Sequence, residues 1–313
     1  MQYRRLGTTG LQLSALSYGT WVTFANQLGR GEAREVVAQC HDHGVNFFDN
    51  AETYANGESE RILGDVLVDL RLPRDSFCVS SKAFFGAVDA PRPTQRGLSR
   101  KHLRDACDQA LARMRLDYLD LYFCHRPDPE VPIAEIVTTM DLLIRQGKVL
   151  YWGTSEWPAA LVLEAIEFAR GNGLFAPQME QPQYNLLERA RVEREYQPLF
   201  AEHGFGATVW SPLASGLLSG KYAQGVPEDS RLNAEGYEWL RKLVLARRDA
   251  VQRSLARFSA LADALGAAPA TLAIAWCLRN PQVTTVILGA SKPAQLDANF
   301  AALELVASLD AEM

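Results

Sequence analysis

The sequence predicts an α/β protein of the (β/α)8 class, a TIM barrel, with an N-terminal β-hairpin and extra helices and loops after the seventh strand. Short apolar, β-rich runs alternate with helical patterns along the whole chain, which is typical of a parallel sheet. Eight such pairs occur, and no linker or shift in composition divides them. The length of 313 residues fits one barrel of roughly 250 residues with extra loops, and also two smaller domains. Because nothing divides the chain, we expect a single domain spanning residues 1–313.

The expected elements follow one another in order. Residues 2–13 alternate around two glycines, which predicts the hairpin. The expected strands are short runs rich in β-branched and aromatic residues: Ala15–Thr20, Val45–Asp49, Phe77–Ser81, Tyr118–Cys124, Val149–Gly153, Gln178–Gln181, Ala207–Trp210 and Thr285–Leu288. The expected helices carry apolar residues at helical spacing: Glu32–His43, Ser59–Leu70, Ser99–Arg115, Ile133–Gln146, Pro158–Arg170, Glu188–His203, Leu240–Leu265, Ala268–Arg279 and Pro293–Leu303. A polar, Gly-rich stretch at 211–231 follows the seventh strand, where we expect the additional loops.

The composition narrows the classes of partner. The formal net charge of −5 argues against nucleic acid and anionic membrane surfaces, because both favour clustered Lys and Arg. No apolar run approaches the roughly 18 residues of a membrane span, so we expect no membrane insertion. The five cysteines include no CxxC pair, and the N-terminus has no secretory signal, so we expect a cytoplasmic protein with free thiols.

Four titratable residues stand just after three consecutive expected strands. Asp49 and Tyr54 follow the second strand, Lys82 the third and His125 the fourth. Taken singly, each suits an ordinary structural role, as a loop cap, a packing residue, a solvated cation or a core histidine. In a barrel of parallel strands, however, the carboxyl ends share one rim, where active sites lie. We therefore expect the four side chains to meet there.

This set suits hydride addition to a carbonyl group, which leaves charge on oxygen and needs a positioned proton donor. Tyr54 would be the donor, and a Lys82 ammonium about 4 Å away would lower the pKa of that phenol towards neutrality. Asp49 would hold Lys82, and His125 would hydrogen-bond the substrate oxygen. No metal is expected, because the CHDH run at residues 40–43 ends a helix and points in different directions.

At these residues the sequence resembles the aldo-keto reductase superfamily. The Asp–Tyr–Lys–His tetrad of that family matches the same four residues in order and context, within FFDNAETYANGESERILG and LDLYFCHRPDP. The resemblance runs from RRLGTTGLQLSALSYGTW to QLDANFAALE and covers essentially the whole chain. It implies a barrel fold and reduction of a carbonyl substrate by a nicotinamide cofactor.

Within the superfamily, the chain is similar to the branch of the potassium-channel beta subunits. The likeness is carried by GTWVTF, YANGESE, HRPDP, YWGTSEW, EQPQYNLLER, WSPLASGLLSGKY and LGASKPAQL. Bacterial members look like NADPH-dependent reductases of small aldehydes, including phosphorylated ones such as glyceraldehyde 3-phosphate. Members form tetramers and other assemblies, which leaves a homo-oligomer open.

The resemblance also implies which residues bind NADP(H). Trp210 would stack on the nicotinamide, and Ser155 and Gln181 would hold its carboxamide. Arg231 and Lys221 would be the partners of the 2′-phosphate, since a cation there favours NADPH over NADH. The remaining contacts would come from residues along the rim: Thr20, Trp21, Asp49, Ser211, Pro212, Leu213, Ser219, Gly289, Ser291, Gln295 and Asn299.

Three positions depart from the pattern of the branch. Glu156 stands where Arg or Asn is usual, which puts one contact to the nicotinamide or substrate in doubt. Ala298 replaces a Glu that contacts adenosine, and Gln295 replaces a frequent Arg at the 2′-phosphate.

The resemblance leaves a second function to weigh, that of a regulatory subunit that senses NADP(H) on a potassium channel. His125 discriminates between the two, because the channel subunits typically carry Asn at that position. The intact histidine favours an enzyme.

Overall fold

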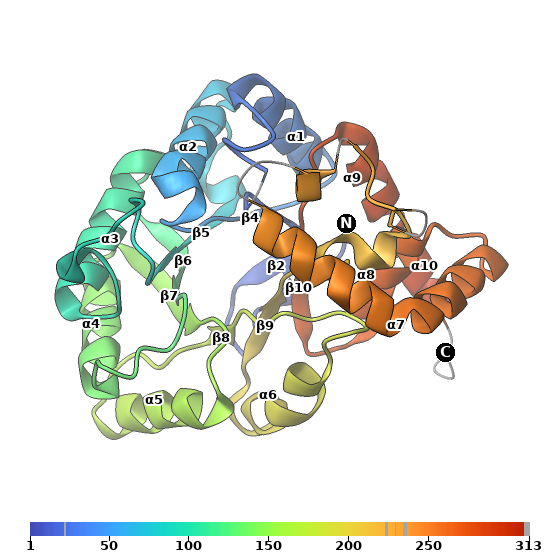
Figure 1. Ribbon diagram of the computed structural model, residues 1–313. Coiled ribbons are helices and arrows are strands. Elements are labelled where there is room, and N and C mark those ends of the chain that lie inside the picture. Colours follow the sequence, from blue (N-terminus) through green and yellow to red (C-terminus); the bar gives the residue numbers. More distant parts are fainter. Residues whose placement is uncertain (22, 223–224, 229, 234–236, 310–313) are drawn as a thin grey trace.

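A closed barrel of eight parallel strands forms the centre of the computed structural model, which describes residues 1–21, 23–222, 225–228, 230–233 and 237–309. The strands neighbour one another in the order β10-β3-β4-β5-β6-β7-β8-β9, so the last strand closes the ring against the first (Figure 1). Their bounds are β3 Leu16–Gly19, β4 Phe47–Asp49, β5 Cys78–Ala83, β6 Leu119–Cys124, β7 Val149–Thr154, β8 Met179–Glu180, β9 Gly206–Val209 and β10 Val283–Leu288. The predicted fold class is confirmed.

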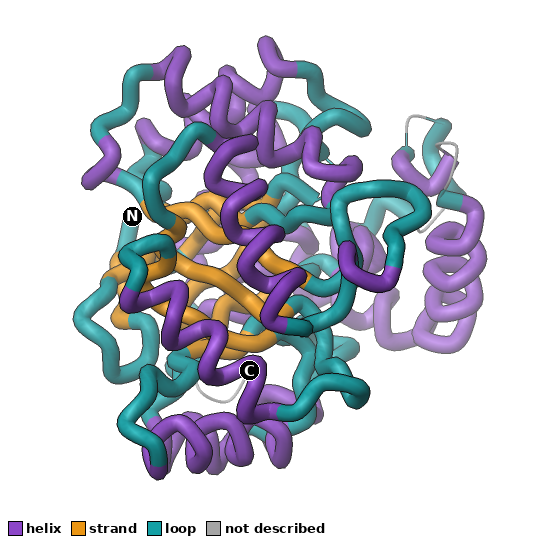
Figure 2. Tube along the Cα trace, turned by 90° about the vertical axis from the view of Figure 1, so that its left-hand side faces the viewer, coloured by secondary structure: helices purple, strands orange, loops and turns teal. Residues whose placement is uncertain are grey.

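Helices surround the barrel, and most of them pack an apolar stripe against the outer face of the strands (Figures 1 and 2). The helices are α1 Arg30–Asp42, α2 Glu58–Leu70, α3 Arg100–Met114, α4 Ile133–Arg145, α5 Ala159–Gly171, α6 Gln197–His203, α7 Glu238–Ala264, α8 Pro269–Arg279, α9 Pro293–Phe300 and α10 Ala302–Ser308. Because helices cover the outside and side chains fill the inside, β5 and β6 are buried at every position.

The predicted N-terminal hairpin closes the end of the barrel opposite the active-site rim. Its strands, β1 (Tyr3–Arg5) and β2 (Gln12–Ser14), pair antiparallel. Leu6 and Leu13 pack on apolar side chains inside the barrel, among them Phe47, Leu121, Phe123 and Met179. At the turn, Gly7 has a φ of +56°, and a Cβ there would lie 2.1 Å from the carbonyl oxygen of Gly204. Only glycine fits this close approach.

Two of the expected helices are interrupted. The pattern at Glu188–His203 becomes a π-helical turn at Arg191–Glu195 followed by α6, because Pro198 in the first turn of α6 has no N–H to continue an α-helix. The pattern at Pro293–Leu303 becomes α9 and α10, which meet at Ala301. The expected strand at Gln178–Gln181 is reduced to the two residues of β8.

The predicted additional elements follow β9. They are the 3₁₀ segments η5 (Ala214–Ser219) and η6 (Arg231–Asn233) and the long helix α7. Leu240 and Val244 of α7 pack with Leu217 and Tyr222 in a small core of their own. This core holds α7 above the barrel mouth, where it stands out beyond the strands on the right of Figure 2.

Candidate active site

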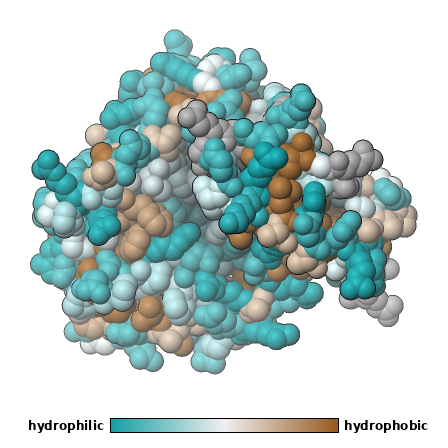
Figure 3. All heavy atoms as spheres, in the orientation of Figure 1, coloured by the Kyte–Doolittle hydropathy of each residue, from teal (hydrophilic) through white to brown (hydrophobic). Residues whose placement is uncertain are grey.

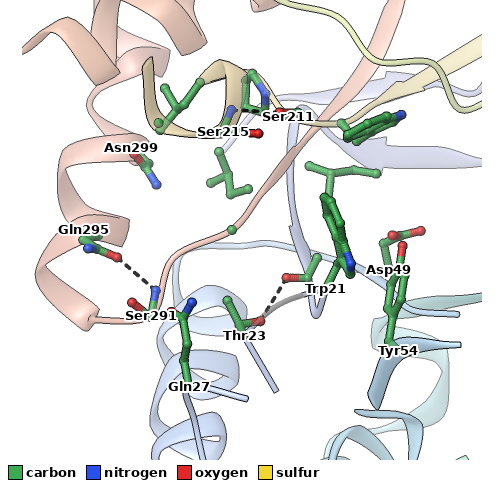
Figure 4. A pocket seen from close by; sticks show the side chains of 18 of the residues that line it. Trp21, Thr23, Gln27, Asp49, Tyr54, Ser211, Ser215, Ser291, Gln295 and Asn299 are labelled. Carbon is green, nitrogen blue, oxygen red and sulfur yellow. Dashed lines mark hydrogen bonds between the residues drawn. The ribbon is translucent and has the colours of Figure 1, made fainter. Parts of the chain in front are cut away.

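The carboxyl ends of the strands open into a cavity of about 660 Å³, at the hollow in the centre of the face seen in Figure 3. Figure 4 shows Asp49 and Tyr54 at one end of it and Ser291, Gln295 and Asn299 at the other. The cavity is lined by most of the residues expected from the sequence: Trp21, Asp49, Tyr54, His125, Ser155, Gln181, Trp210, Ser211, Pro212, Leu213, Lys221, Gly289, Ser291, Gln295 and Asn299.

Lys82 is the centre of a hydrogen-bonded cluster beneath the cavity. Its side chain is 0% exposed, and its ammonium donates to the Asp49 carboxylate at 2.7 Å and to the Asn50 carbonyl at 2.7 Å. The same ammonium lies 3.2 Å from the hydroxyl of Tyr54. Asp49 is held in turn by the hydroxyl of Ser80 and by the amide of Gln181, so the pair cannot rotate freely. The expected carboxylate, ammonium and phenol therefore meet at one point.

The fourth residue, His125, packs beside Tyr54 on the cavity wall. The two rings meet edge to face, with centroids 6.0 Å apart. Burial, with the cations of Lys82 and Arg126, holds the pKa of His125 well below its usual range, so its imidazole is neutral. The Nδ1 atom is buried and has no hydrogen-bond partner among the described residues. A bare nitrogen costs less to leave unpaired than an N–H group, which favours the tautomer with its proton on Nε2.

The electrostatics of Tyr54 differ from the sequence-based expectation. Burial and the Asp49 carboxylate hold the pKa of Tyr54 well above its usual range, and only Arg126 acts against them. The expected lowering by Lys82, with Asp49 offsetting it only in part, is wrong, because desolvation by burial dominates and the Asp49 carboxylate adds to it. The phenol is therefore fully protonated at neutral pH, as a proton donor must be.

A strained turn follows Tyr54. Ala55 and Asn56 have φ values of 47° and 53°, and Gly57 continues the left-handed path at 84°. A non-glycine residue in this region costs about 1–2 kcal/mol, and such strain persists where the surroundings hold it. Here the amide of Asn56 donates to Asp89 at 2.6 Å, which fastens the turn that leads from Tyr54 into α2.

The cavity matches an elongated nucleotide with anionic groups. Ser155 and Gln181 offer hydroxyl and amide groups near the tetrad, and Trp210 offers a flat aromatic face. Lys221 and Lys292 also line the cavity and bring cations to it. The far end lies at the N-terminus of α9, where backbone N–H groups favour a phosphate. The residues present therefore fit a nicotinamide dinucleotide.

Two expected cofactor residues turn away from the cavity, and a third is not placed. The hydroxyl of Thr20 donates to the carbonyl of Asp49 at 3.1 Å, which ties β3 to β4. The hydroxyl of Ser219 donates to the carbonyl of Gly216 at 2.7 Å within η5. Both hydroxyls satisfy local backbone groups and do not line the cavity. The side chain of Arg231 lies outside the described part of the structure.

Several cavity residues were not predicted from the sequence. Arg126 follows His125 directly and places its guanidinium 5.7 Å from the ring of Phe85. Its position next to His125 at a strand end was a signal that could have identified it. Trp239, at the start of α7, lies far along the chain from any strand end, and no pattern indicated it. Thr23 and Gln27 also line the cavity, from the loop before α1 (Figure 4).

The unusual residues at two family positions have partners in the structure. Gln295 accepts a hydrogen bond from the backbone N–H of Ser291 at 2.9 Å, so its amide folds back onto the loop (Figure 4). Glu156 accepts hydrogen bonds from the indole N–H of Trp210 at 3.0 Å and the backbone N–H of Gln183 at 2.6 Å.

The buried carboxyl of Glu180 on β8 leads to a prediction about pH and stability. Burial, with the Glu156 charge adding to it, raises the pKa of Glu180 from 4.5 to about 8. Between these two pH values the folded protein keeps a proton that the unfolded chain releases. The free energy of unfolding therefore falls as the pH rises from 4.5 to about 8. Removing this titration with Glu180→Gln should change the slope of unfolding free energy against pH by up to ~1.4 kcal/mol per unit.

Urea unfolding at several pH values between 5 and 8 measures the two slopes. Glu202→Gln, at an exposed position of α6, is the control and should leave the slope as it is in the parent protein. If the unfolding free energy of the parent protein and that of Glu180→Gln change with pH at the same slope, Glu180 does not titrate in this way.

No single helix in the described ranges is long and apolar enough to cross a membrane. Taken together, α7 and α8 have the length and apolar composition of a membrane span, but the chain bends by 92° at the break between them.

Comparisons with known proteins identify the family of this chain. Residues 15–313 match the model of the aldo/keto reductase family. A protein of Arabidopsis thaliana named "Probable voltage-gated potassium channel subunit beta" is 46% identical over 98% of this chain and 92% of its own length. A protein of the same name from Oryza sativa subsp. japonica is 46% identical over 100% of this chain and 94% of its own length. With a family match over nearly its whole length and the barrel in place, this chain belongs to the aldo/keto reductase family.

Proposed function

We propose that this protein, as one domain spanning residues 1–313, uses NADPH to reduce small aldehydes and ketones to alcohols. The observation that carries the proposal is the Lys82 ammonium, which lies within hydrogen-bonding distance of both Asp49 and the Tyr54 hydroxyl at the cavity floor. The family is one of oxidoreductases that bind NAD(P)H. The cofactor, when bound, supplies the hydride to the carbonyl carbon.

The chain's own residues handle the proton. The Tyr54 hydroxyl donates its proton to the carbonyl oxygen, and the high pKa of Tyr54 keeps that proton available throughout the neutral range. The phenolate left behind lies 3.2 Å from the Lys82 ammonium, which stabilises it until a proton returns. His125, neutral and protonated on Nε2, would hydrogen-bond the same carbonyl oxygen and hold it towards Tyr54.

The proposed preference for NADPH rests on two cations as partners of the 2′-phosphate. Lys221 lines the cavity and supports this assignment. Arg231 is the second proposed partner, by motif match. Gln295 does not offer the charge of the usual arginine, so these two cations carry the preference.

Arg126 favours substrates that carry an anionic group, such as a phosphorylated aldehyde. Its guanidinium donates to the His125 carbonyl at 2.5 Å and to the Ser155 hydroxyl at 3.4 Å, and no carboxylate pairs with it in the described ranges. A cation next to the proposed proton-transfer site, with neutral partners only, can take a phosphate oxygen.

Oxidation of NADPH in the presence of short aldehydes, ketones and their phosphorylated forms tests the proposal, with NADH as the comparison. Arg126→Met should lower the ratio of kcat/KM for a phosphorylated aldehyde to that for a neutral one by roughly tenfold or more, the value of a charge-assisted hydrogen bond. Arg104→Met, on the exposed side of α3, should leave that ratio unchanged. An unchanged ratio for Arg126→Met would exclude the anion-binding role.

The names of the two plant relatives raise a second candidate, a potassium-channel subunit with little turnover. It predicts that the protein binds NADPH but does not oxidise it with any carbonyl compound of the panel. Turnover with a small aldehyde would favour the enzyme.

A further inference from the structure

The carboxylate of Glu156 holds the indole of Trp210 from behind the cavity wall. One carboxylate oxygen accepts both the indole N–H at 3.0 Å and the backbone N–H of Gln183 at 2.6 Å. The other accepts from the guanidinium of Arg191 at 2.5 Å. Three donors from separate parts of the chain therefore converge on one side chain, which is about 20% exposed.

The backbone around this contact is unusual. Glu156 has a φ of 59°, a left-handed conformation that costs about 1–2 kcal/mol for a residue with a side chain. Arg191 begins the π-helical turn Arg191–Glu195, a rare element that is frequent at functional sites. Both features lie next to the same carboxylate: Glu156 accepts the indole N–H on one oxygen and the guanidinium of Arg191 on the other.

Trp210 is also fixed on its other sides. Its backbone pairs with Gln183 in an isolated bridge, and the ring of Trp21 meets its ring edge to face with centroids 5.9 Å apart. Trp21 in turn lies 6.4 Å from the ring of Tyr54. The indole is therefore a fixed wall of the cavity next to the tetrad, and its N–H is the one hydrogen-bonding group of the ring.

We propose that Glu156 is a positioning residue that fixes the Trp210 indole and enriches its ring in electrons, so that the cavity binds oxidised nicotinamide cofactor in preference to reduced. The proposal rests on the proposed function, in which the nicotinamide stacks on Trp210. A carboxylate that accepts the indole N–H polarises it and strengthens the negative face of the ring. The oxidised nicotinamide ring is a cation and gains from that face, whereas the reduced ring is neutral.

This preference has a consequence for the reaction. By thermodynamic linkage, a site that binds the oxidised cofactor more tightly than the reduced one makes the bound reduced cofactor a stronger hydride donor. Glu156 would thus favour carbonyl reduction over alcohol oxidation, and Arg191 would limit the effect by partly neutralising the carboxylate.

Calorimetric titration of the full-length protein with NADP⁺ and with NADPH measures Kd for the oxidised and the reduced cofactor. Glu156→Gln keeps an acceptor for the indole N–H but removes the charge, so Kd for NADP⁺ should rise about fivefold and Kd for NADPH less than about twofold. Trp210→Phe removes the N–H and keeps a ring, so it should reduce the preference for NADP⁺ even if Glu156→Gln fails to fold. Adding Glu156→Gln to Trp210→Phe should then change the preference no further.

Glu195→Gln is the matched control. Glu195 belongs to the same π-helical turn and lies 3.6 Å from Arg191, but it accepts from the backbone of Ala159 and does not touch Trp210. It should leave the ratio of the two Kd values unchanged. Equal weakening of both cofactor forms by Glu156→Gln, or no change in either, would overturn the proposal. Failure of the parent protein to bind either form would instead refute the proposed function.

Discussion

Tyr54→Phe is expected to lower kcat by roughly 10²–10⁴-fold while the protein still binds NADPH. The substitution removes the only hydroxyl that lies within hydrogen-bonding distance of Lys82 in the described ranges. It leaves the aromatic ring in place, so the packing against His125 is kept. Because the proposed proton donor is lost and the cofactor contacts are not, the effect should fall on kcat.

Steady-state kinetics with the best aldehyde of the panel, together with NADPH titration, measure the two quantities. Tyr3→Phe makes the same chemical change in the N-terminal hairpin, where the hydroxyl donates to the carbonyl of Gly44, and should leave kcat unchanged. Normal turnover by Tyr54→Phe would mean that another group donates the proton.

Lys82→Met is expected to destabilise the protein by about 3–5 kcal/mol, the usual cost of breaking a buried ion pair from one side. Lys82 and Asp49 are both buried, with side chains 0% and 5% exposed, so the remaining carboxylate would lose its main counter-ion away from water. The Asp49 carboxylate would keep its bonds from Ser80 and Gln181, which compensate only in part.

Urea unfolding measures this loss. Arg30→Met removes the cation from an exposed pair with Asp69, where Arg30 is 52% exposed, and should cost only about 0–1 kcal/mol. Adding Asp49→Asn to Lys82→Met should recover part of the stability, because no charge is then left unpaired. A cost below about 1 kcal/mol for Lys82→Met would show that the Asp49 carboxylate is not held as a buried charge.

Much of the barrel could be predicted because its signals are local in sequence. Runs such as Tyr118–Cys124 are apolar at nearly every position, as strands buried on both faces must be, and each is followed by a helical pattern. The break in the helix expected at Glu188–His203 could also have been predicted from the sequence, because Pro198 cannot continue an α-helix.

The position of the tetrad followed from topology. In a closed parallel barrel all strands point the same way, so polar residues at the carboxyl ends of β4, β5 and β6 must converge. That constraint places Asp49, Lys82 and His125 on one rim without any knowledge of side-chain rotamers.

Only the tertiary structure decided how individual side chains orient and ionise. Thr20 and Ser219 follow the pattern of cavity residues, but their hydroxyls turn to nearby carbonyls because short side chains satisfy local backbone groups first. The pKa of Tyr54 rises because burial and the Asp49 carboxylate outweigh Arg126, and the order of residues carries no measure of burial. The hydrogen bond between Glu156 and Trp210 joins the loops after β7 and β9, so no local pattern could reveal it. The amino-acid sequence by itself determined the strands, the helices and the residues at their ends. The charge and direction of the side chains in the tetrad depended on neighbours that are distant in the chain and adjacent only in the folded barrel.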